Sequence, residues 1–153
     1  MSQAPDQQLF DDEERLWTEL NRLVGSLPAG EVAKPGYFEE GWSAKDLVGH
    51  IGSWLAEAGV VLERIDAGTY RPEEIDIEAM NEAFYGSLHD VPFPDVRAQT
   101  IAARNRMLRA WRSLPERSAE GDRWIAKAGP EHYTEHLPRL QEWIRELNAP
   151  GAR

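Results

Sequence analysis

Cysteine is absent from the 153-residue sequence. Its absence excludes disulfide bonds, thiolate metal sites and a cysteine nucleophile, so a thiol that takes part in chemistry must belong to a bound molecule. The sequence also lacks an apolar run long enough to span a bilayer. Residues 1–6 have neither the charged nor the apolar region of a signal peptide. We therefore expect a cytoplasmic protein without a membrane segment.

Positive charge is scarce as well. Lys and Arg number 17 against 27 Asp and Glu, which gives a formal net charge of −10. An acidic surface repels the phosphate backbone and no basic stripe interrupts it, so the chain is not expected to bind nucleic acid. The length fits one domain, which we place over residues 1–153 with its core at about residues 6–148.

Strand signals are also weak. No segment alternates apolar and polar residues over a useful length. Apolar residues instead recur at spacings of three and four, which predicts helices over residues 5–27, 43–67, 72–88, 94–114 and 129–148. The stretch 116–128 is predicted to be a loop anchored by Trp124 and Ile125. The fold class is therefore all-α, a four-helix bundle with a short extra helix before the third long helix.

The second predicted helix directs a histidine inward. Ser43 is a candidate N-cap, and Asp46 occupies the capping-box position three residues later. The apolar stripe of this helix includes Leu47 and Trp54, and His50 lies on the same face. A titratable ring that faces a core needs a partner, and that partner is either a backbone carbonyl or a metal ion.

The last predicted helix carries two more histidines on its apolar stripe. His132 and His136 are four residues apart, so their Cβ atoms lie roughly 5–6 Å apart on one face. Two imidazoles at this spacing can chelate one ion. If this helix runs parallel to the second one, His50 joins them at one end of the bundle. A solvated pair and a core histidine remain the alternatives, and His89 is expected to be exposed.

Two motifs carry a resemblance to a known family. They are Trp-Ser-Ala-Lys-Asp-Leu-Val-Gly-His at residues 42–50 and His-Tyr-Thr-Glu-His at residues 132–136. Over about residues 9–147 the chain resembles the DinB/YfiT-like four-helix-bundle superfamily. Within it, the chain is most similar to the ClbS/DfsB-like branch and to the N-terminal domain of mycothiol-dependent maleylpyruvate isomerases.

The resemblance implies both a topology and a site. The topology is up-up-down-down, with helices one and two parallel and helices three and four parallel. The site is a divalent-metal centre formed by His50, His132 and His136, although the isomerases often have an acid at the position of His132. Relatives are often homodimers, so a homodimer is expected, with Trp17 or Trp143 as candidate interface residues.

These observations lead to a functional hypothesis and two alternatives. The hypothesis is a metal-dependent enzyme, with zinc or nickel activating water or a low-molecular-weight thiol against a reactive small-molecule substrate. It would be a thiol transferase or a hydrolase. The alternatives are a non-catalytic small-molecule binding or resistance protein, and a structural bundle without metal.

Four charged residues are candidates for supporting roles. Arg104 lies on an inward face and could bind a substrate carboxylate or form a helix-to-helix ion pair. Asp46, Glu131 and Glu135 stand close to the histidines in sequence and could orient a ring or act as a base, although solvation is the commoner role for the two glutamates. No catalytic residue is assigned.

Overall fold

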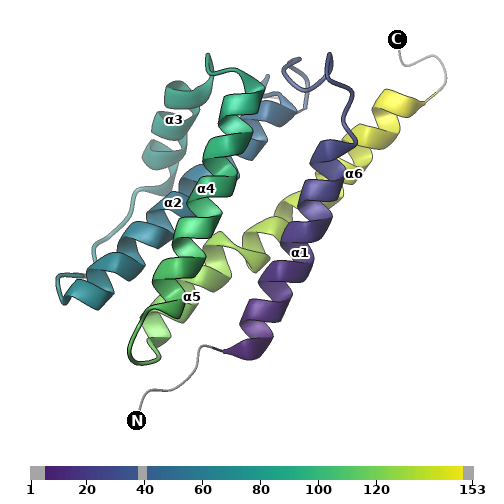
Figure 1. Cartoon of the computed structure of the whole chain (residues 1–153). Helices are drawn as coiled ribbons and strands as arrows, with labels where there is room; N and C mark the ends of the chain where they lie inside the picture. Colours follow the sequence, from purple (N-terminus) through teal and green to yellow (C-terminus); the bar gives the residue numbers. More distant parts are fainter. Residues whose placement is uncertain (1–5, 38–40, 150–153) are drawn as a thin grey trace.

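The computed structural model describes residues 6–37 and 41–149, and no strand occurs among them. Figure 1 shows the helices arranged as a bundle. Their bounds are α1 Gln7–Gly25, α2 Ala44–Ala67, α3 Ile77–Leu88, α4 Phe93–Arg112, α5 Ala119–Ala128 and α6 Pro130–Asn148. The predicted all-α fold, with its short helix before the third long one, is confirmed. Within the described residues, every helix is too short or too polar to cross a membrane.

The directions of the helices differ from the prediction. Along α2 and α4, Gly49 faces Val96 and Gly59 faces Met107, so these two helices run parallel. Figure 1 shows α1 running against both of them, and α5 and α6 returning in the direction of α1. The order is therefore up-down-down-up, and the predicted up-up-down-down arrangement is wrong.

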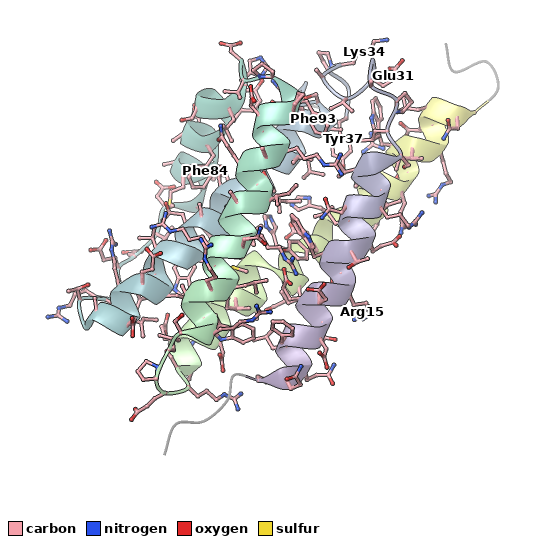
Figure 2. The ribbon with its side chains drawn as sticks, viewed as in Figure 1. Arg15, Glu31, Lys34, Tyr37, Phe84 and Phe93 are labelled. Atoms are coloured by element: carbon pink, nitrogen blue, oxygen red, sulfur yellow. The ribbon has the colours of Figure 1, made fainter. Side chains whose placement is uncertain are left out.

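The segment between α1 and α2 explains this topology. It does not cross the length of the bundle but folds at one end, where the amide of Lys45 donates to the carbonyl of Val32 and the amide of Tyr37 donates to that of Trp42. Tyr37, labelled in Figure 2, is fully buried, with its ring edge-on to Trp143 at 5.9 Å between centroids. The crossover that makes two helices parallel comes later, where α3 carries the chain back before α4 begins (Figure 1).

Helices α2 and α4 approach closely because small residues face each other. A Cβ atom added to Gly52 would lie 2.2 Å from Oγ1 of Thr100 and 2.9 Å from its Cα. The Thr100 hydroxyl is buried and donates to the carbonyl of Val48 at 3.1 Å. Ile101, the next residue, is 39% exposed, because Thr100 occupies the contact position beneath Gly52.

Residues 119–128 form helix α5, so the predicted loop is wrong here. Ser118 caps this helix by accepting the amide of Gly121 at 3.0 Å. Gly121 itself lies against the side chain of Leu62 on α2. The amide of Gly129 still bonds the carbonyl of Ile125, and the amide of Tyr133 bonds that of Gly129. Helices α5 and α6 thus form one interrupted rod.

The short helix α3 begins later than predicted. The sequence predicts Pro72 as its first residue, but the helix starts at Ile77 after Asp76, whose side chain accepts the amide of Ala79 at 3.0 Å. The Asp76 side chain can cap the helix because it accepts a hydrogen bond from an amide of the first turn. Arg71, the residue before Pro72, has no side-chain acceptor for such an amide. Residues 69–76 therefore remain outside the helices.

One of the two tryptophans suggested for a dimer interface lies in the core. Trp17 is only 8% exposed, and its ring packs against Tyr133 at 5.8 Å between centroids. Trp143 is partly buried beside Tyr37. Trp17 is therefore unsuited to an interface, and the homodimer stays a prediction.

The close approach of α2 and α4 can be tested with Gly52→Ala. The added methyl group forces these helices apart, and overpacking of this kind should lower the free energy of unfolding by about 1–3 kcal/mol. The matched control is Gly86→Ala in α3, where a new Cβ meets open space. That change should be neutral or slightly stabilising, because alanine favours helix over glycine. Equal urea midpoints for both variants would contradict the assignment.

Candidate metal centre

A capped helix end positions His50. It lies in the second turn of α2, after the capping box that the sequence predicted. The amide of Ser43 donates to Oδ2 of Asp46 at 2.8 Å, and the amide of Asp46 donates to Oγ of Ser43 at 3.2 Å. Asp46 therefore caps the start of the helix, and it does not orient the His50 ring.

The other two histidines occupy the first two turns of α6. Tyr133 and Leu137, each one residue further along, are buried and hold the neighbouring side of this helix against the core. The hydroxyl of Tyr133 donates to Oε2 of Glu13 on α1 at 2.9 Å. His132 and His136 are thereby turned towards α2.

The structure brings the three rings together. The Nε2 atom of His132 lies 3.0 Å from Nε2 of His50 and 3.1 Å from Nε2 of His136. One nitrogen from each ring falls within 4.8 Å of the other two. They meet although α2 and α6 run in opposite directions. Helix α5 occupies the first part of the length that α5 and α6 cover together, so α6 begins near the middle of that length, where it faces α2.

This cluster suits a cation better than it suits hydrogen bonds. A neutral imidazole nitrogen carries either one proton or one lone pair, so Nε2 of His132 can form a good hydrogen bond with only one of its two neighbours. A tetrahedral ion with nitrogens at 2.0–2.1 Å holds them about 3.3 Å apart, close to two of the observed spacings. Nδ1 of His50 is also buried without a hydrogen-bond partner among the described residues. The donor set therefore fits a divalent metal.

Burial keeps the three rings neutral. It lowers the pKa of His50 to about 4, and the nearby His136 adds to the effect. It also lowers the pKa of His132 to about 3, with further lowering by His50 and His136 and a small opposing effect from the backbone of Ala128. The pKa of His136 is lowered by burial as well, while Glu135 opposes the shift. Lone pairs are therefore available at neutral pH without deprotonation.

A cavity of about 470 Å³ opens onto the cluster. His50 and His132 form part of its wall. The remaining lining residues come from α2, the segment before α3, α3, α5 and α6, and they are Trp54, Tyr70, Pro72, Glu73, Ile75, Ile77, Asn81, Glu120, Arg123, Trp124, Lys127, Ala128 and Glu135. The wall from α5 is not evident in the sequence, where residues 116–128 are predicted to be a loop. Its signal was the Ser118 cap followed by inward residues at positions 121, 125 and 128.

Arg104 lies away from this cavity. Its guanidinium donates to both carboxylate oxygens of Glu13, at 2.9 and 2.6 Å, and also contacts Glu14. It lies over the ring of Trp17 at 4.9 Å. The structure thus shows the helix-to-helix ion pair, the alternative to a substrate-binding role. Glu13 is 1% exposed, so the acidic start of α1 is only partly solvated.

Of the remaining candidate residues, one lines the cavity and two lie outside the site. Glu135 lines the cavity, whereas Glu131 is exposed outside it. His89 is exposed as predicted, with its ring against Tyr85 and its Nδ1 3.4 Å from Asp46. It takes no part in the cluster.

Fold and site together define a class of protein: a helical bundle with three histidines beside a cavity that opens to solvent. A family model described as the mycothiol maleylpyruvate isomerase N-terminal domain matches residues 14–141, and the chain belongs to this family. The resemblance read from the two histidine motifs is thereby confirmed. No curated protein and no solved structure shows significant similarity to the chain.

The ion pair of Arg104 should matter for the stability of the fold. Arg104→Met leaves the Glu13 carboxylate buried without its cation, which should lower the free energy of unfolding by about 3 kcal/mol. The control Arg106→Met breaks a comparable pair with Glu63, but that pair is exposed. Its loss should be far smaller, because water screens such pairs. The free energies of unfolding are measured by chemical denaturation. Equal losses in Arg104→Met and Arg106→Met would contradict this expectation.

The neutral cluster should make the metal-free protein sensitive to mild acid. The unfolded chain takes up protons near pKa 6.5, whereas folded His50 resists them until about 4 and His132 until about 3. Because the unfolded state binds more protons in this window, stability is full above about pH 6.5 and declines as the pH falls. His50→Gln should flatten the slope measured with a chelator present between about pH 7 and pH 5. Parallel slopes for wild type and variant would contradict this.

Proposed function

We propose that this protein is a divalent-metal-dependent enzyme that promotes attack of a small nucleophile on an electrophilic small molecule. The observation that carries the proposal is the convergence of three neutral imidazole nitrogens beside a cavity of about 470 Å³. His50, His132 and His136 are the proposed ligands. Three protein ligands with a further position open to the cavity are typical of catalytic zinc sites, whereas structural sites are closed.

The ligand set determines what the centre can supply. A bound divalent ion acts as a Lewis acid that makes water or a thiol nucleophilic at neutral pH. Three neutral imidazoles leave the charge of the ion unreduced, unlike a set that includes a carboxylate. Zinc and nickel both suit such nitrogen donors.

A thiol is the nucleophile that we favour over water. The family description names mycothiol. The chain contains no cysteine, so the thiol would enter as a cosubstrate. The cavity walls provide aromatic and apolar surface for an organic molecule, from Trp54, Trp124 and Ile75. We therefore propose thiol transfer to a reactive small molecule, with hydrolysis as the second reaction type.

The metal assignment is tested by His50→Ala. This change removes the only ligand on α2, so zinc and nickel affinity measured by competition with a chelator should fall by at least about a hundredfold, while the helical circular dichroism persists. His132→Ala and His136→Ala should behave alike. His89→Ala is the matched control, because His89 lies outside the cluster, and its metal affinity should equal that of the wild type. Stoichiometric metal retained by His50→Ala would place the site elsewhere.

Turnover separates an enzyme from a binding protein. The metal-loaded protein is mixed with a thiol and an excess of an electrophilic aromatic halide, and product is followed over time. Product in excess of protein supports catalysis. Capture that stops at one equivalent of protein, with or without thiol, supports the alternative of a resistance protein that sequesters its ligand.

A further inference from the structure

A hydrogen bond at the wall of the cavity fixes the orientation of an amide. The indole Nε1 of Trp54 donates to Oδ1 of Asn81 at 2.7 Å. Both residues line the cavity that contains His50 and His132. Trp54 follows His50 by one turn of α2, so the indole that holds the amide lies on the same side of that helix as His50.

The partner decides which end of the amide is free. An indole nitrogen can only donate a hydrogen bond, so it must meet the oxygen of Asn81 and not the nitrogen. The ring of Trp54 is itself held, since it packs edge-on against Phe84, one turn beyond Asn81 on α3, with 5.4 Å between the ring centroids. Asn81 Nδ2 forms no hydrogen bond with any described residue, and it is not a buried unsatisfied atom. Its two protons are therefore available to a ligand.

The geometry points to Asn81 as the residue that orients the substrate, with Nδ2 donating to a carbonyl or carboxylate oxygen of a molecule bound beside the three histidines. This inference rests on the proposed function and adds a substrate class to it: compounds with an oxygen acceptor attached to an apolar or aromatic body. Ile75 and Ile77 line the same cavity and are unusually exposed for large apolar residues, at 38% and 59%. They provide the apolar surface for that body. Trp54 is the positioning residue, because it acts through Asn81.

Two neutral probes of similar shape test the donor. They are 4-fluoroacetophenone, which has an oxygen acceptor, and 4-fluorotoluene, which has none. Their dissociation constants are measured by fluorine NMR with zinc-loaded and with metal-free protein. In the wild type the ketone should bind more tightly than the toluene. Asn81→Leu removes the donor, and should weaken ketone binding about tenfold while leaving toluene binding and zinc affinity unchanged.

A second pair of variants separates orientation from surface area. Trp54→Phe keeps an aromatic ring but frees the amide to rotate, so the preference for the ketone should fall about threefold. Trp124→Phe is the matched control, because its indole also lines the cavity but contacts the Tyr70 hydroxyl, at 3.4 Å. Its preference should not change.

The outcomes distinguish this inference from the proposed function. A ketone preference that is absent in the wild type, or unchanged in Asn81→Leu, would overturn the role of Asn81 even if zinc binds as proposed. A wild-type protein without zinc affinity would overturn the metal proposal. In that case, a ketone preference of the metal-free protein that is lost in Asn81→Leu would still support Asn81 as the hydrogen-bond donor. Equal effects of Trp54→Phe and Trp124→Phe would refute the positioning role of Trp54.

Discussion

The carboxylate of Glu13 links three helices of the bundle. Glu13 belongs to α1 and accepts hydrogen bonds from Arg104 on α4 and from Tyr133 on α6. A buried carboxylate without partners costs several kcal/mol, so the arrangement is stable only when both donors are in place. The network therefore fixes the positions of α1, α4 and α6 along the bundle axis relative to one another. Because Tyr133 follows His132 directly, it also fixes the level at which the last two histidines enter the interior.

A different kind of restraint sets the position of α2. Gly52 brings this helix so close to α4 that a Cβ atom there would collide with Thr100, and Gly49 lies against Leu88 at the end of α3 and Val96 on α4. His50 lies between these glycines in sequence, on the face turned towards α6. Helix α4 carries no histidine of the cluster, yet it is the common reference for both helices that do. The convergence of the three nitrogens thus depends on a polar network on one side and on steric contact on the other.

The parts of this arrangement that are encoded locally could be read from the sequence. The cap of α2, its end at Gly68 and the inward histidines depend on neighbours within a few residues, and the structure agrees with them. Helix direction could not be read in this way, because an apolar stripe is the same whichever end comes first. Helix α5 is not evident in the sequence because Trp124 and Ile125 are its only large apolar anchors, whereas in the structure the absence of a side chain at Gly121 allows contact with Leu62.

The chemistry of the centre follows from the same burial that shapes the fold. The three imidazoles are held close together in a setting that disfavours their charged forms, as the lowered pKa values of His50 and His132 show. Protonation at neutral pH therefore does not compete with metal for the lone pairs. A carboxylate ligand would have reduced the charge of a bound ion, but the imidazoles do not. A centre of this kind should therefore attract electron-rich ligands strongly, and the fixed donor of Asn81 would then decide how such a ligand is oriented in the cavity.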